Sequence, residues 1–314
     1  MWPAQSAARC GSRKRCGRDQ DNAIAAVILM KRMSDILAVL DRGPMDSALV
    51  AKASGLAAQF NGRLELFLCD AEHAYVMKHD YEPSHNEELR RTCMAQAIEY
   101  LQSLRTVAKL PEERVSASAA CESPLYEGVV RKVLQSRPDL VIKGASGLES
   151  PARPVFDGND WQLMRKCPTN LMMTRGRIWR NRPRFAAAVD ISAQETAGLA
   201  GAILGTAEAL RLVHGAELDV LYAEPGNVSA GTGEARLSTL RGLTQSYKVQ
   251  ADSLRVLNGK AEEALPAFAA ERDYDAMVMG ALTHRPGMVA LVGTLTSKLV
   301  DTVACDFVLV KSQD

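Results

Sequence analysis

A glycine-rich segment follows an apolar run near the C-terminal end of the chain. Residues 276–279 read Ala-Met-Val-Met, residues 280–283 read Gly-Ala-Leu-Thr, and Gly293-Thr294 follow after nine more residues. A strand that runs into glycine, with a Gly-Thr pair opening a helix, is typical of phosphate cradles in α/β folds, because backbone N–H groups can approach the anion. Residues 141–147, Val-Ile-Lys-Gly-Ala-Ser-Gly, resemble an altered earlier copy. Two copies indicate a duplicated domain.

Apolar runs alternate with helix-like stretches twice along the chain. This order predicts an α/β protein with two tandem, doubly wound, five-stranded parallel sheets of the Rossmann-like class. Ligands in such sheets bind at the carboxyl ends of the strands, near a topological switch point. Asp41, Gly144, Asp190 and Gly280 lie at those ends. The predicted strands cover residues 36–40, 64–69, 115–119, 140–142 and 171–173, and then 185–189, 218–222, 253–257, 276–279 and 307–310.

The repeat divides the chain into a first domain, residues 33–175, and a second domain, residues 183–314. The basic segment between them is interpreted as a solvated connector rather than a nucleic-acid site. Residues 1–32 carry seven Lys or Arg against two Asp. Their apolar stretch is far shorter than the roughly 20 residues of a membrane helix, and no small-residue cleavage site follows it. We therefore expect a non-native or disordered extension, with Met33 as the natural start.

Charge and cysteine usage narrow the class of protein further. The net charge is +1, of which residues 1–32 contribute +5, so the remainder is about −4 and disfavours nucleic acid as a partner. The seven cysteines form no CxxC pair and are odd in number, which is typical of packing thiols in a reduced cytoplasmic protein. His73, His79 and His85 recur every six residues within a polar stretch, residues 70–86, and are interpreted as loop residues rather than metal ligands.

The chain resembles the tandem members of the universal stress protein family. The shared features are a strand that ends in Asp, a second strand about 25 residues later, and a Gly-rich loop with a closing Gly-(Ser/Thr) after the fourth strand. Residues 160–168, Asp-Trp-Gln-Leu-Met-Arg-Lys-Cys-Pro, are similar to the first domain of the universal stress protein E type. The resemblance covers residues 33–314. It implies a cytoplasmic stress-response role.

The resemblance also implies a site for an adenine nucleotide, ATP or AMP, in the second domain. Gly280 matches the family's first glycine, Thr283 stands where the second is expected, and Gly293-Thr294 match the closing pair. Asp190 matches the acidic residue that lies near the adenosine in nucleotide-binding members. Beyond these matches, the side chains of His284 and Arg285 would add donors near a phosphate.

The first domain departs further from this pattern. Ten residues separate Gly147 from Gly158-Asn159, and the loop carries the carboxylates of Glu149, Asp157 and Asp160. Carboxylates repel a polyphosphate at short range. We therefore expect that the first domain does not bind ATP.

Two functions from different classes are weighed here, and a third class, an enzyme that adenylates or hydrolyses a substrate on a related α/β fold, is disfavoured because no catalytic residues are visible. The first is a stress-response protein that binds an adenine nucleotide as a sensor or regulator, which the intact Gly280 and Gly293-Thr294 favour. The second is a scaffold, or a carrier of another small ligand, which Thr283 and the altered first loop favour. No nucleophile elbow, HExxH or Walker sequence occurs, so we expect no catalytic residues and no metal. The apolar last strands favour two halves packed as a built-in dimer, with a homodimer as a further assembly.

Overall fold

The structure is a computed structural model that describes residues 33–79, 83–147, 155–192, 198–226, 229–247, 249–281, 299–300 and 302–311. The extension predicted for residues 1–32 and most of the helix predicted for residues 294–303 lie outside this range. The first half contains the strands and helices β1 (Asp35–Leu40), α2 (Asp46–Gln59), β2 (Arg63–Cys69), α3 (Ala71–His79), α4 (Pro83–Arg105), β3 (Val115–Ala120), α5 (Leu125–Ser136), β4 (Leu140–Gly144), α6 (Gly158–Lys166) and β5 (Asn170–Thr174).

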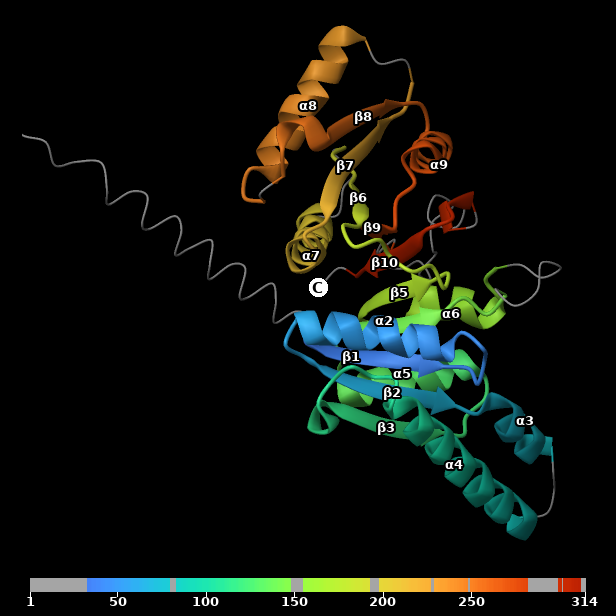
Figure 1. Ribbon diagram of the computed structural model, residues 1–314. Coiled ribbons are helices and arrows are strands. Elements are labelled where there is room, and N and C mark those ends of the chain that lie inside the picture. Colours follow the sequence, from blue (N-terminus) through green and yellow to red (C-terminus); the bar gives the residue numbers. More distant parts are fainter. Residues whose placement is uncertain are drawn as a thin grey trace, which may run out of the picture.

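The second half repeats this order on the other side of the molecule (Figure 1). Short 3-10 turns precede the third strand of each half, at Glu112–Arg114 and Ala251–Ser253. The elements of the second half are β6 (Arg184–Ala188), α7 (Leu199–His214), β7 (Glu217–Glu224), α8 (Ala230–Thr244), β8 (Leu254–Asn258), α9 (Ala261–Arg272), β9 (Ala276–Gly280) and β10 (Asp306–Val310).

All ten strands form one sheet, in the order β3-β2-β1-β4-β5-β10-β9-β6-β7-β8. Within each half the strands are parallel, and β5 meets β10 in antiparallel pairing, with Met172 opposite Val308. The prediction of two five-stranded parallel sheets joined by their last strands is therefore confirmed. The order on one side of the junction mirrors that on the other, as a pseudo-two-fold axis requires.

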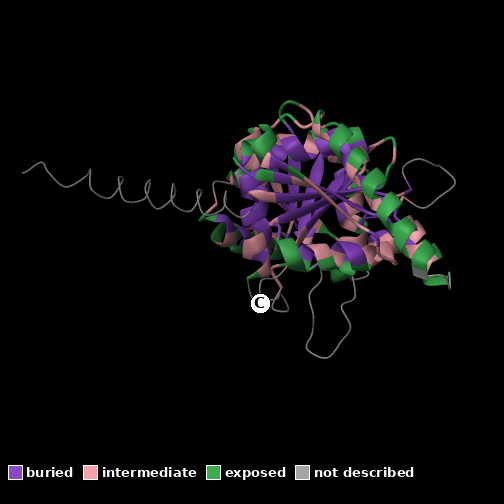
Figure 2. Ribbon diagram, turned by 90° about the horizontal axis from the view of Figure 1, so that it is seen from below, coloured by how far each residue is buried: buried purple, intermediate pink, exposed green. Residues whose placement is uncertain are grey.

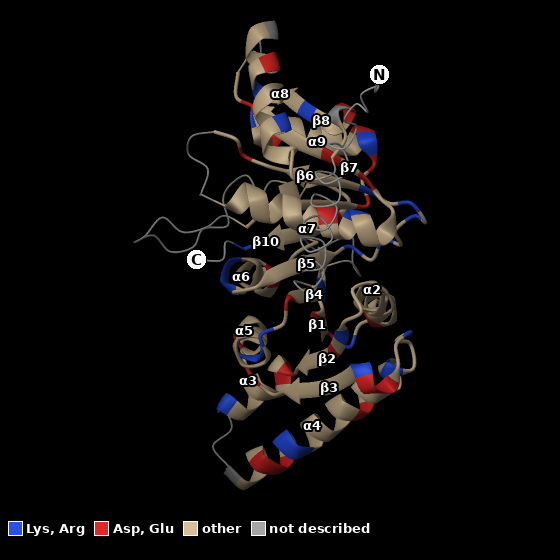
Figure 3. Cartoon of the chain, turned by 90° about the vertical axis from the view of Figure 1, so that its left-hand side faces the viewer, with Lys and Arg blue, Asp and Glu red and all other residues tan. Residues whose placement is uncertain are grey.

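Helices cover both faces of the sheet because its strands alternate apolar side chains toward each face. In β1, Ile36 and Ala38 belong to the core under α2, α4, α7 and α8, whereas Leu37 and Val39 belong to the core under α5, α6 and α9. Figure 2 shows the buried residues in the sheet and on the inner sides of the helices, with exposed residues on the outside. In Figure 3 the outer helix α4 carries both Lys or Arg residues and Asp or Glu residues along its length.

Gly62 cannot be replaced by a larger residue without a shift of the backbone. A Cβ on Gly62, in the turn from α2 to β2, would lie 1.9 Å from the backbone oxygen of Ser34. This close approach fixes where β2 begins beside β1.

The interpretation of residues 70–86 as a loop was wrong. His73 and His79 lie in α3, and His85 lies in α4. The carboxylate of Asp70 accepts the His73 N–H at 3.1 Å and so caps α3, with Glu72 in its first turn. The polar composition hid this helix because only Ala74 of α3 is buried.

Among the described residues, no helix combines the length and apolarity needed to cross a membrane. The five described cysteines are all buried and free, as expected of packing thiols.

Candidate functional site

Each half has a switch point where its first strand lies between the second and the fourth. In the first half β1 pairs with β2 on one side and with β4 on the other, and in the second half β6 pairs with β7 and β9. Asp41 and Gly144 therefore lie at the carboxyl end of one crevice, and Asp190 and Gly280 at that of the other. Ligands of open α/β sheets bind at such crevices. We call them the first and the second crevice.

An internal ion cluster fills the base of the first crevice. The side chain of Lys143, on β4, is only 1 % exposed, and its ammonium lies 2.6 Å from Asp41 Oδ2 and 3.0 Å from Asp160 Oδ1. It also donates to Ser146 Oγ at 3.0 Å. Burial alone would lower the pKa of Lys143, but the two carboxylates outweigh it and the pKa lies above its ordinary value. The lysine therefore stays charged inside the fold.

The carboxylate of Asp160 takes the place that an anion would occupy beside this loop. It accepts the Ser146 N–H at 2.9 Å, the Ser146 hydroxyl at 3.1 Å and the Asp157 N–H at 3.2 Å. Asp157 in turn caps α6 by accepting the Asp160 N–H at 2.8 Å, which completes a capping box. The N–H groups of Ser146, Asp157 and Asp160 are thus already used by the protein's own carboxylates.

The cleft above this cluster is acidic. It has a volume of about 540 Å³, and its lining includes the carboxylates of Asp41, Asp46, Asp70, Glu72 and Asp157, against the single guanidinium of Arg42. Burial raises the pKa of Asp46, although its bond from the Tyr100 hydroxyl (2.9 Å) opposes this. A polyphosphate entering this cleft would meet carboxylates on most sides.

Among the residues that the structure describes, the second crevice keeps the strand arrangement of the first but has methionine in place of the buried lysine. Met279 stands on β9 at the position that Lys143 holds on β4, one residue before the glycine that ends the strand. Asp190 is exposed, and its Oδ1 accepts the Ser192 N–H at 2.8 Å. Gly280 ends β9 under α7, where a Cβ would lie 2.8 Å from a methyl carbon of Leu199. Helix packing is therefore one reason for this glycine.

Of the predicted nucleotide-binding residues, the structure brings Asp190 and Gly280 to the ends of adjacent strands. The others, Thr283, Arg285, Gly293 and Thr294, lie outside the described residues, as does His284.

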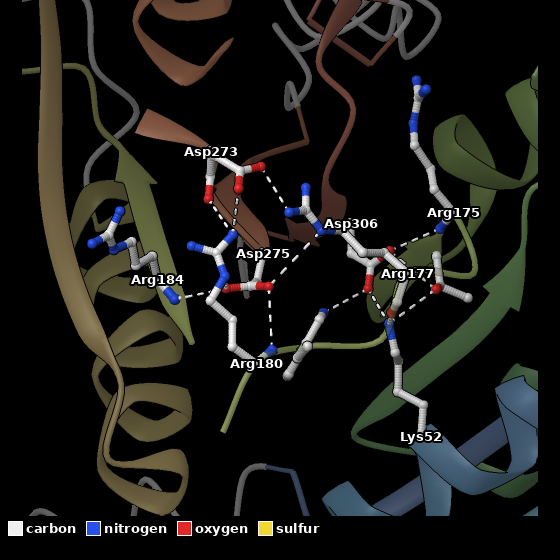
Figure 4. A network of polar contacts seen from close by, with 10 residues as sticks. Lys52, Arg175, Arg177, Arg180, Arg184, Asp273, Asp275 and Asp306 are labelled. Atoms are coloured by element: carbon white, nitrogen blue, oxygen red, sulfur yellow. Dashed lines mark hydrogen bonds and ion pairs between the residues drawn. The ribbon is translucent and has the colours of Figure 1, made fainter. Parts of the chain in front are cut away.

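The connector between the halves is held by ion pairs rather than solvated throughout. Arg177 and Arg180 contact Asp273 at 2.7 and 2.8 Å, and Arg180 also reaches the fully buried Asp275 at 3.2 Å (Figure 4). The fully buried Asp306, on β10, pairs with Lys52 of α2. The basic run thus anchors the connector on the second half, which its charge pattern alone did not reveal.

Asp306 also binds the end of β5. It accepts the Arg175 N–H at 2.8 Å, the Thr174 hydroxyl at 3.0 Å and the Trp179 indole N–H at 2.8 Å. The strand junction and the connector therefore share one buried carboxylate.

These features define a tandem α/β protein with a switch-point crevice in each half, and comparison with known proteins agrees. Residues 33–175 and 184–311 each match the model of the Universal stress protein family, so the chain belongs to that family as a tandem member. It is 22% identical to universal stress protein E of Photorhabdus laumondii over 302 residues, covering 90% of this chain and 96% of that protein. It is 20% identical to universal stress protein E of Escherichia coli K12 over 300 residues, covering 90% and 95%.

A solved structure shares the whole fold. The crystal structure of a functionally unknown protein from Pseudomonas aeruginosa PAO1 aligns with a TM-score of 0.68 at 22% identity, covering 90% of this chain and 94% of that one. Membership of the universal stress protein family supports a role in the stress response.

Lys143 is the functional residue that sequence reasoning missed. A signal was present, since a lysine inside the apolar run of β4 must be paired when the strand is buried. Asp160 had been interpreted only as a charge repelling phosphate.

Proposed function

We propose that this protein binds an adenine nucleotide, ATP or AMP, in its second crevice and acts as a cytoplasmic stress-response sensor or regulator rather than as a catalyst. The difference between the two crevices carries the proposal. In the first crevice, the Lys143 ammonium pairs with the Asp160 carboxylate, and that carboxylate also accepts the Ser146 N–H of the loop. In the second, methionine replaces the lysine and Asp190 is exposed.

The roles in the second crevice follow from position and residue type. The loop that begins at Gly280 would present backbone N–H groups to the phosphates, with Thr283, Gly293 and Thr294 along it and Arg285 as a cation. Asp190, across the switch point, would lie on the nucleoside side. The second loop carries His284 and Arg285, whereas the first carries Glu149 and Asp157 against Arg153 and is followed by Asp160, so the local charge of the second loop suits an anion better.

A matched pair of variants tests this function. Gly293→Val places a branched side chain where the predicted helix begins, and it should abolish binding of ATP. Gly158→Val makes the same change at the start of α6, where a Cβ has nothing within 4 Å, and should leave affinity unchanged. Thr283→Gly, which restores the family's glycine, should strengthen binding.

Calorimetric titration with ATP and with AMP measures all four proteins. If wild type shows no heat at millimolar nucleotide and Thr283→Gly does not restore it, the nucleotide function fails. Equal loss in Gly158→Val and Gly293→Val would place the site elsewhere.

A second candidate, carriage of another small ligand, is favoured by a cleft beside the connector. This cleft has a volume of about 490 Å³ and lies between α2 and residues 176–181, with Leu49, Leu56, Ile178 and Trp179 among its apolar lining. Ile178 is 88 % exposed. Clefts of this size and apolar character suit small ligands. Mass spectrometry of material released from freshly purified protein separates the two candidates, since it would show a nucleotide or an apolar compound.

A further inference from the structure

A second cluster of reactive side chains lies at the edge of the first half. It joins Asp70, which follows β2, His73 in the first turn of α3, and Cys93 in α4. His73 Nδ1 lies 2.9 Å from Asp70 Oδ1, and Cys93 Sγ lies 3.3 Å from Asp70 Oδ2. The three ligand atoms all lie within 4.8 Å of one another.

A second thiol lies beside this group. Cys121 follows β3 directly, is 4 % exposed, and packs with Cys93 and Ala74 in a small cluster separate from the two main cores. Three separate segments of the chain therefore bring two thiols, one imidazole and one carboxylate together, namely residues 70–73, helix α4 and the end of β3.

This donor set is typical of zinc. Thiolate and imidazole ligands select soft or borderline cations over Mg²⁺ or Ca²⁺. A tetrahedral zinc ion with Zn–S near 2.3 Å and Zn–N near 2.0 Å needs ligand atoms about 3.3–3.8 Å apart. The observed spacing, at most 4.8 Å between Asp70, His73 and Cys93, comes within small side-chain rotations of that requirement.

A purely structural role explains only part of the cluster. Asp70 caps α3 and pairs with Arg42 at 3.0 Å, which accounts for the carboxylate and for the backbone of His73. It does not account for a thiol that donates to that carboxylate or for the second thiol behind it. On binding, the cation would replace the two thiol protons, which would leave to solvent, and it would take the lone pair of His73 Nδ1 while the ring N–H lies on Nε2.

The cluster is reachable from solvent on two sides. Asp70 lines the acidic first crevice, and Cys121 lines a separate cleft of about 660 Å³ together with Glu122 and Glu127. The side chain of His73 is 39 % exposed. A divalent cation can therefore reach the cluster through the acidic first crevice, or through this second cleft, whose lining mixes glutamates with Lys78, Arg90 and Arg131, while the sulfur ligands stay buried.

We propose that Asp70, His73, Cys93 and Cys121 form a binding site for a soft divalent cation, with Zn²⁺ as the natural ion. The site is independent of the nucleotide crevice in the second half.

The test uses the full chain, stripped with a chelator and kept reduced, and titrated with Co²⁺ as a spectroscopic probe and with Zn²⁺ in competition. We expect one equivalent to bind, with a thiolate-to-cobalt charge-transfer band and the strong visible absorption of tetrahedral Co²⁺. Cys93→Ser and His73→Ala should each weaken Zn²⁺ binding by more than about tenfold, a loss at least as large as that from outer-shell changes. Cys167→Ser, which alters a buried thiol in the other core, should leave binding unchanged.

His73→Ala changes a partly exposed residue of α3, so it keeps the test decisive if the buried Cys93→Ser does not fold, and circular dichroism checks both. Absence of binding in the wild type overturns the proposal, as does cobalt bound without the charge-transfer band. Binding that persists in a Cys93→Ser/His73→Ala double variant also overturns it. The proposal is also overturned if alkylation of freshly purified protein reveals a Cys93–Cys121 disulfide and the reduced protein then retains no zinc.

Discussion

Replacing Lys143 by methionine, the residue that the second half has at the same position, should destabilise the first half strongly. The change leaves the Asp160 carboxylate, which is 0 % exposed, without its cation. Removing one partner of a buried ion pair costs about 3–5 kcal/mol. The lower part of that range applies, because Asp160 keeps its bonds from Ser146 and Asp157.

A double variant separates the loss of charge balance from the loss of packing. In Lys143→Met/Asp160→Asn, the amide oxygen can accept from the Ser146 and Asp157 N–H groups, and the amide NH₂ can donate to the Ser146 hydroxyl. No charge is then left buried, so the double variant should be more stable than the sum of the two single changes by about 2 kcal/mol, within the usual range for residues in contact.

Urea unfolding measures this cycle, with circular dichroism for the whole sheet and the fluorescence of Trp161, which follows Asp160 in α6, for the local structure. Coincident transitions would justify a single free energy of unfolding. Additive effects, or a Lys143→Met cost below about 1 kcal/mol, would refute the reasoning that the cluster is a buried, mutually dependent ion pair.

Two further predictions concern the connector. Burial and the nearby Lys52 ammonium lower the pKa of His214 from 6.5 to about 4. The unfolded chain therefore binds this proton at a higher pH than the folded chain does. The free energy of unfolding should fall by roughly 1–3 kcal/mol as the pH drops from 6.5 toward 4. Urea unfolding at several pH values should show a smaller fall in the His214→Phe variant. Cleavage at a protease site built around the exposed Ile178 should leave the halves together at micromolar concentration, because β5 and β10 stay paired; separation on size-exclusion chromatography would contradict this.

The sequence predicted the sheet well because its signals are local. Short continuous apolar runs such as residues 36–40 and 276–279 are typical of strands buried on both faces, and the glycine or aspartate after each run marks the carboxyl end. The pairing of the last strands, residues 171–173 with 307–310, was implied by the resemblance to the universal stress protein family, and the structure confirms it, with Met172 opposite Val308.

The sequence did not predict the polar contacts, because their partners are far apart along the chain. Lys143 and Asp41 are 102 residues apart, and Lys52 and Asp306 are 254 apart. Helix α3 was missed for a different reason. Its side chains are mostly polar and partly exposed, so no apolar stripe marks it, and only the cap by Asp70 and the charges at its ends indicate a helix.

The contrast between Lys143 and Met279 shows how two copies of a domain can differ in the chemistry of their crevices while they keep the same fold. Each residue lies in the fourth strand of its half, directly before the glycine that ends that strand at the switch point. A lysine there needs carboxylates, and Asp41 and Asp160 supply them from the neighbouring strand end and from the start of α6. Those carboxylates in turn use the loop donors that a phosphate would require. A methionine needs no counter-charge, so the equivalent acidic residue, Asp190, stays exposed beside its crevice. Because the ten strands that the structure describes form one sheet, the two crevices are held in a single frame, and the ion cluster of the first can stabilise that frame while the second, under the proposed function, takes the ligand.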